Sequence, residues 1–168
     1  MQTTAVRLYG KEDLRMETFE LPAHGDDEIL ARVVSDSICM SSFKAAEQGS
    51  EHKRVPADCA EHPVIIGHEF CGELISVGKK WQDRYRAGDK FSIQPAINYK
   101  GTLDAPGYSY RWIGGDATYI VIPNEVMEND CLLPYSGEAF FYGSLAEPMS
   151  CIVGAFHASY HTNYGSYV

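Results

Sequence analysis

Four residues carry side chains of the types that bind zinc in proteins: Cys39, the adjacent pair His68 and Glu69, and Glu147. Zinc accepts thiolate, imidazole and carboxylate ligands, and a catalytic zinc site uses about three of them and keeps one position open. Residues so far apart in the chain are weak evidence by spacing alone. Each also has a structural interpretation: Cys39 could be a small buried hydrophobic side chain, His68 a hydrogen-bonded core histidine and Glu69 a surface acid.

The residues around Glu147 bear on how its carboxylate is used. Residues 144–147 match the capping-box pattern, in which the glutamate bonds the start of a helix. That pattern places Pro148 at the fourth helical position, where an N–H would normally bond the cap carbonyl. A helix that begins at Pro148 is more favourable, because the first turn tolerates proline. We therefore expect a helix over residues 147–160 and favour an inward-pointing Glu147 carboxylate.

The elements that must position these residues are mostly short strands. β-branched and apolar residues predict strands within residues 3–9, 28–36, 63–78, 90–94 and 117–122. Glycines inside the 63–78 segment indicate bends or close backbone approach. A short helix is expected over residues 41–48, with Gly49 as its end. Residues 95–115, rich in Tyr, Pro and Gly, are expected to form a long functional or interfacial loop.

Length and composition restrict the class of protein. The 168 residues correspond to one domain, and the elements predict a mainly β fold with peripheral helices, arranged as a partly open β-barrel. The net charge of −9 makes nucleic acid or an anionic membrane a poor partner. Five scattered cysteines and a start without signal-peptide character indicate a cytoplasmic protein. The sequence also lacks the G-x-G-x-x-G turn of a dinucleotide site.

A longer motif surrounds two of the candidate ligands. Gly67-His68-Glu69, followed by Gly72 and Gly78, resembles the G-H-E-x₂-G-x₅-G signature of the zinc-containing alcohol dehydrogenases, in the medium-chain dehydrogenase/reductase superfamily. Further matches extend over essentially the whole chain: Cys39, Gly88-Asp89, Gly114-Gly115 and Ala146-Glu147-Pro148. The glutamate of the last match resembles the polyol dehydrogenase branch, and the sequence as a whole is most similar to the L-sorbose-1-phosphate reductases within it.

The resemblance implies a GroES-like catalytic domain over residues 1–168, with one catalytic zinc bound by Cys39, His68 and a carboxylate from Glu69 or Glu147. It also implies catalytic roles for Glu69 and for Ser41, which matches the hydroxyl that passes the substrate proton. The implied reaction interconverts a polyol or polyol phosphate with a ketose or ketose phosphate, L-sorbose 1-phosphate included. Hydride comes from NAD(P), because no side chain can supply it.

Two further expectations concern the whole protein. The nucleotide-binding domain is expected outside these 168 residues, so the isolated chain should be inactive. The full-length protein is expected to be a homo-oligomer that acts on a small-molecule substrate.

The sequence also departs from the family pattern. Ser42 and Lys44 stand where the family often has aspartate and histidine, so the zinc ligands must be supported by other residues. Residues 95–115 contain no cysteine, so no structural zinc is expected. These losses keep open a second function class, a non-catalytic GroES-like binding module that has lost zinc. The zinc-free quinone reductase branch is a precedent for such a module.

Other candidate sites are weaker. His157 and His161 lie one helical turn apart, and Cys59 and His62 have C-x₂-H spacing, but neither pair has a further ligand nearby. We therefore interpret both pairs as structural or solvated. Four cations could contact a substrate phosphate, but scattered cations are usually solvated surface residues: Lys44, Lys53, Arg54 and Arg111.

Overall fold

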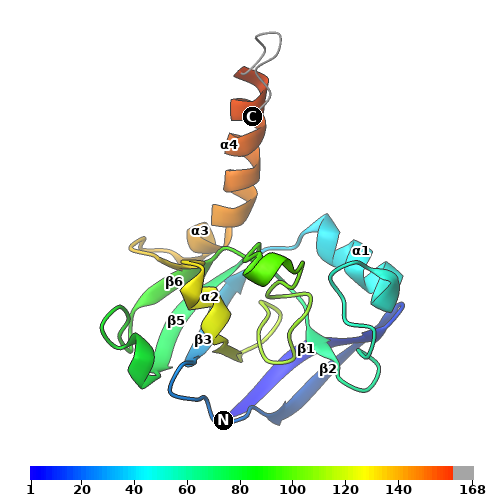
Figure 1. Ribbon diagram of the computed structural model, residues 1–168, viewed down its shortest axis with the longest axis horizontal. Helices are drawn as coiled ribbons and strands as arrows, with labels where there is room; N and C mark the ends of the chain where they lie inside the picture. The colour runs from blue at the N-terminus through cyan, green and yellow to red at the C-terminus, as the bar shows by residue number, and fades with distance from the viewer. Residues whose placement is uncertain (161–168) are drawn as a thin grey trace.

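The computed structural model describes residues 1–160 and consists mainly of two antiparallel sheets (Figure 1). The three-stranded sheet has the order β2-β1-β4, formed by Asp13–Glu20, Gln2–Gly10 and Val64–Ile65. The five-stranded sheet has the order β7-β3-β5-β6-β8, formed by Tyr119–Ile122, Ile29–Asp36, Phe70–Val77, Lys90–Ile93 and Leu132–Pro134. Within the described residues neither sheet closes on itself, which confirms the mainly β, partly open fold.

The helices lie outside the sheets. They are α1 (Met40–Gln48), α2 (Asn124–Glu128), α3 (Phe140–Ser144) and α4 (Ala146–Tyr160), with 3₁₀ turns η1 (Gly49–Glu51), η2 (Lys79–Trp81) and η3 (Tyr99–Gly101). Helix α4 projects away from the sheets (Figure 1). Over residues 1–160, no helix combines the length and apolar character that a membrane crossing would need.

Two groups of buried side chains hold the sheets and the loops together. The larger core lies on the five-stranded sheet and includes Phe70, Phe91 and Ile120. The smaller core joins β1, α1 and the loop before β7, with Leu8, Ala45 and Tyr108 among its members. Because Ala45 and Tyr108 are fully or almost fully buried, the smaller core fixes α1 against that loop.

The segment 63–78 forms two strands rather than one, and the break between them lies at the glycine of the signature. Gly67 has φ +88°, a conformation that L side chains rarely adopt, and a Cβ there would lie 2.3 Å from the Asp36 carboxylate. The resulting bend separates β4 from β5. It places His68 and Glu69 directly before β5, at the side of the sheet where β3 ends.

The structure also contains elements that the sequence patterns do not predict. Strand β2 is among them although it alternates charged residues with Leu14 and Met16, and β8, α2 and α3 are only three to five residues long. Helix α4 begins at Ala146, one residue before the start of the expected helix over residues 147–160. The capping-box interpretation is wrong, because Ser144 ends α3 and its hydroxyl donates to the Phe141 carbonyl at 3.0 Å.

Candidate active site

Three of the four candidate ligands converge at the junction of β3, α1 and β5. Cys39 is the N-cap residue of α1, and His68 and Glu69 follow the bend at Gly67. One ligand atom from each of these three residues lies within 4.8 Å of the other two. We call these three residues the donor cluster. The His68 and Glu69 side chains are almost fully buried, and Cys39 is half-buried.

Neighbouring hydroxyl groups hold the donor cluster in place. The Ser42 Oγ lies 3.1 Å from His68 Nδ1 and is a hydrogen-bond partner for that nitrogen. Ser42 stands at the position where the family often has aspartate. The Ser37 hydroxyl donates to Glu69 Oε2. Outer partners of this kind fix the orientation of the imidazole ring and of the carboxylate. Ser42 and Ser37 are therefore the supporting residues that the sequence alone did not identify.

Ser41 and Tyr108 contact the donor cluster from the solvent side. The Ser41 Oγ lies 2.9 Å from Cys39 Sγ and 3.3 Å from His68 Nε2. The Tyr108 hydroxyl lies 3.2 Å from the same nitrogen. Burial raises the pKa of Tyr108 to about 12, so the phenol remains protonated at neutral pH. His68 Nε2 therefore faces two hydroxyl groups at the point where a metal or substrate would be expected.

The pKa shifts at the site leave His68 in the neutral form that can bind a cation. Burial lowers the pKa of His68, Glu69 opposes this shift and Arg54 adds to it, so the imidazole is neutral at pH 7. Burial and the adjacent Glu69 carboxyl raise the pKa of Glu147, as expected for two acids close together without a cation between them. A thiol, a neutral imidazole and two nearby carboxyl groups form a donor set that fits zinc.

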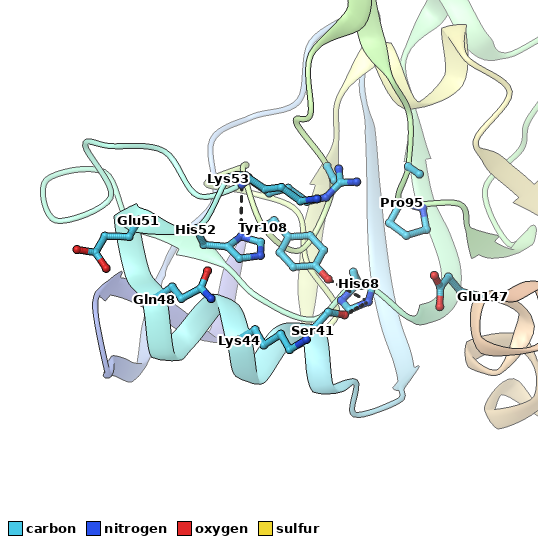
Figure 2. A pocket seen from close by; sticks show the side chains of 13 residues that line it. Ser41, Lys44, Gln48, Glu51, His52, Lys53, His68, Pro95, Tyr108 and Glu147 are labelled. Atoms are coloured by element: carbon cyan, nitrogen blue, oxygen red, sulfur yellow. Dashed lines mark hydrogen bonds between the residues drawn. The ribbon is translucent and has the colours of Figure 1, made fainter.

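Through His68, the donor cluster borders a pocket of about 590 Å³ (Figure 2). Ser41, His68 and Glu147 line one part of it. The carboxylate of Glu147 points from α4 toward this part, in agreement with the inward-pointing interpretation (Figure 2). The 95–115 loop contributes further lining residues: Pro95, Ala96, Ala105 and Tyr108.

Three of the four candidate phosphate contacts also line this pocket. They are Lys44 from α1 and the pair Lys53 and Arg54 from the segment after η1, and we call these three residues the basic wall. Arg111 is not among the lining residues. Figure 2 shows Lys44 on one side of Tyr108 and Lys53 on the other.

Of the remaining candidate pairs, Cys59 and His62 lie outside the donor cluster and do not line the pocket. Cys59 is buried in the smaller core, and its thiol donates to the Tyr9 carbonyl at 3.6 Å, in agreement with a structural role. His161 lies outside the described residues, so the structure does not place the His157–His161 pair.

Sequence reasoning missed several residues that the structure brings to the site: Ser37, Tyr108 and the acidic pair Asp36 and Asp116. Only the unusual composition of the 95–115 loop pointed toward Tyr108. Asp36 lies under the site, where burial and the neighbouring Asp116 raise its pKa to about 8. The glycines at 67 and 115 make room for this carboxylate, since a Cβ at either position would lie 2.3 Å from it.

Comparisons with known proteins agree with this arrangement. A model of the alcohol dehydrogenase GroES-like domain matches residues 25–131. An L-sorbose 1-phosphate reductase from Klebsiella pneumoniae is 61% identical over 165 residues, which are 98% of this chain and 40% of that protein. A mannitol-1-phosphate 5-dehydrogenase from Aliivibrio fischeri is 50% identical over 161 residues, or 96% of this chain and 38% of that protein. The chain thus spans about two fifths of the length of these curated relatives.

Solved structures share the fold at lower sequence identity. The 2R,3R-butanediol dehydrogenase of Bacillus subtilis superposes with a TM-score of 0.75 at 24% identity and covers 93% of this chain and 47% of its own. A Sinorhizobium meliloti protein described as a zinc-binding dehydrogenase, with NADP bound, also has a TM-score of 0.75, at 23% identity over 94% of this chain and 45% of its own. The family model covers more than half of the residues, and this chain therefore belongs to the alcohol dehydrogenase GroES-like domain family.

Proposed function

We propose that this chain is the catalytic part of a zinc-dependent, NAD(P)-linked dehydrogenase that interconverts a polyol phosphate and a ketose phosphate, with L-sorbose 1-phosphate as the favoured substrate. The observation that carries the proposal is the donor cluster, whose His68 lines, together with Ser41, a pocket of about 590 Å³. The relatives named for sugar phosphates support the substrate class. The unphosphorylated polyol and ketose are the alternative substrates.

The donor cluster would hold the zinc ion through Cys39, His68 and Glu69. Glu147 lies outside the group of mutually close ligand atoms, so we assign it to the pocket as a second carboxylate. When bound, zinc would act as a Lewis acid that makes a hydroxyl group easier to deprotonate and a carbonyl group easier to reduce. We expect one zinc per chain and no structural zinc.

Ser41 is the residue that would pass the substrate proton. Its hydroxyl lines the pocket and also contacts two members of the donor cluster, so one side chain links substrate and ligands. A serine hydroxyl both donates and accepts, and it can therefore take a proton from one partner while giving one to another. In the opposite direction the same hydroxyl returns the proton to the product.

A second histidine lies on the pocket wall. His52 lines the pocket and stacks on Tyr108 with ring centroids 5.7 Å apart. Burial and the charges of Arg54 and Lys53 lower the pKa of His52, so its imidazole is neutral at pH 7, and its Nδ1 accepts the Arg54 backbone N–H at 3.3 Å.

The hydride would come from a nicotinamide bound by a further domain. Helix α4 supports this part of the proposal, because it exposes a row of large apolar side chains: Met149, Ile152, Val153 and Phe156. Exposed apolar surface of this kind marks a contact with other protein. We expect the nucleotide-binding domain to cover it, and we expect the isolated chain to be inactive.

Metal analysis of the purified protein tests the proposal. We expect about one zinc per chain in the wild type and none in His68→Ala. His62→Ala is the matched control, because His62 lies outside the donor cluster, and it should retain the zinc. Failure of the wild type to take up zinc from a zinc-supplemented buffer would contradict the enzyme proposal and favour the GroES-like binding module without metal.

A further inference from the structure

The basic wall lies in the same pocket as the donor cluster, although the protein as a whole is acidic. Lys44, Lys53 and Arg54 line the pocket, whereas its acidic lining residues are Glu51 and Glu147. Glu147 lies at the end of the pocket near His68, and in Figure 2 the Glu51 carboxylate points away from Tyr108. In a chain with a net charge of −9, this concentration of positive charge at one cavity calls for a physical reason.

The three cations of the basic wall have no carboxylate partner within residues 1–160. None of them takes part in the ion pairs of that region, whereas Lys79, Lys80 and Arg84 all pair with acids. Arg54 instead donates to the neutral Leu103 carbonyl at 2.6 Å. Their charge is therefore available to an anion from solution.

Neighbouring residues hold the backbone and the side chain of Arg54 in place. Its N–H donates to His52 Nδ1 at 3.3 Å, and its carbonyl accepts a hydrogen bond from the Ser109 hydroxyl at 2.6 Å. The guanidinium carbon lies 5.9 Å from the centre of the Tyr108 ring. Tyr108 in turn contacts His68, so one aromatic side chain connects the basic wall to the donor cluster.

The basic wall acts on a neighbouring group of the same pocket. Burial, with the charges of Arg54 and Lys53, lowers the pKa of His52. Ser41 and His68 line the same pocket. The cations and the candidate catalytic groups therefore share one cavity.

We propose that Lys44, Lys53 and Arg54 form the subsite that binds the phosphate of a phosphorylated ketose or polyol, an assignment that rests on the proposed function. A phosphate dianion offers several acceptor oxygens, which suit the planar guanidinium of Arg54 and the flexible ammonium groups of the lysines. The pocket volume of about 590 Å³ falls within the usual range for small-molecule sites, about 300–1,000 Å³. The carbon chain would extend past Tyr108, so that the reacting carbon reaches Ser41 and His68.

The subsite also explains how the protein would select phosphorylated substrates. An unphosphorylated sugar leaves the cations of the basic wall without a counter-charge, whereas the phosphate ester pairs with them. The same anion chemistry occurs in the 2′-phosphate of NADP. The experiment must therefore distinguish the phosphate of the substrate from the phosphate of the cofactor.

The test compares kcat/KM for L-sorbose 1-phosphate and L-sorbose in the full-length protein that contains this chain. We expect the ratio of the two values to fall at least about tenfold in Lys53→Gln and further in Arg54→Gln, because a pair between a charged side chain and phosphate contributes about one factor of ten or more. Arg111→Gln is the matched control, since it removes one positive charge outside the pocket and should leave the ratio unchanged. An unchanged ratio in both pocket variants would overturn the proposal.

A binding measurement separates this proposal from the function proposed above. Calorimetric titration of zinc-loaded protein with L-sorbose 1-phosphate and with L-sorbose should show a preference for the phosphate ester, which Lys53→Gln reduces. Equal binding of both compounds overturns the phosphate subsite even where the enzyme is active. A KM change confined to NADPH, with the sugar-phosphate KM unchanged, also overturns it. Absence of zinc and of turnover, with phosphate-dependent binding intact, contradicts the proposed function alone.

Discussion

In the donor cluster, buried side chains hold one another through hydrogen bonds to serine and tyrosine hydroxyls, whereas in the basic wall two lysines are exposed and only Arg54 is partly buried. The difference follows from the two tasks. A metal ligand must be held at one position because its bonds are short and directional, whereas a cation that attracts phosphate acts over a longer distance and tolerates movement. One pocket thus combines a rigid chemical end with an adaptable charged end.

The largest expected effect comes from removing a proposed zinc ligand from the donor cluster. Cys39→Ser replaces a soft thiolate with a hydroxyl that binds zinc poorly. Loss of an outer partner of a zinc ligand typically costs 10- to 100-fold in affinity, so loss of a ligand should cost more than about 100-fold in zinc affinity and in activity. Competition with a chelator of known affinity measures the change. Wild-type affinity in Cys39→Ser would show that the thiol is not a ligand.

The half-buried acids Asp36 and Asp116 predict a pH effect on stability. The folded-state pKa of Asp36 is raised to about 8, above its ordinary value of 3.8, so the folded state keeps a proton that the unfolded state has lost. Stability should therefore fall as pH rises from 6 to 8, by about 2 kcal/mol for this group.

Asp36→Asn tests that expectation in zinc-free protein. Asparagine resembles the protonated acid and does not titrate, so the variant should lose less stability than the wild type over this pH range. Urea unfolding at several pH values measures both. Equal pH dependence in the two proteins would show that Asp36 does not carry the proton.

A substitution with a weaker expected effect tests the hydrogen bonds that support the donor cluster. Ser42→Ala removes the hydroxyl that contacts His68 Nδ1 and leaves the zinc ligands themselves intact. We expect zinc affinity to fall about tenfold, the usual cost of losing an outer partner. Ser50→Ala, an exposed serine of η1, is the control and should bind zinc like the wild type. A Ser42→Ala variant with unchanged affinity would indicate that another group orients the ring.

The smallest expected effect concerns the adaptable end. Because Lys44 and Lys53 are exposed, salt should screen their attraction for phosphate. We expect the KM for L-sorbose 1-phosphate to rise about threefold between low salt and 0.5 M sodium chloride, while the KM for L-sorbose and the zinc content stay constant. A parallel rise in both KM values would mean that salt acts on the whole enzyme and not on the basic wall.

Much of the fold follows from local sequence patterns. β1, β3, α1, β6, β7 and α4 lie within a few residues of their expected positions. Strand β2 alternates charged residues with Leu14 and Met16, but these apolar side chains are exposed, and its place is fixed by pairing with β1. Short elements such as α3 depend on the core they cover, and their few residues carry little propensity of their own.

The candidate site divides in the same way. The residue types of the donor cluster and the glycine signature around His68 are enough to indicate zinc chemistry. Tyr108, by contrast, is one of several tyrosines in a loop, and only the smaller core brings its hydroxyl to His68. Lys53 and Arg54 are adjacent charged residues in a polar segment, and nothing local distinguishes them from Arg111.

The sequence by itself determined which donors this protein possesses, its acidic composition and the glycine that bends the chain before His68. Only the tertiary structure decided that Cys39 meets His68 and Glu69, that Ser42 supports the imidazole, and that the basic wall opens onto the same pocket. The reason is physical. Donor chemistry and backbone freedom belong to single residues, whereas a binding site depends on distances between segments that only packing of the two cores and pairing of the strands can set.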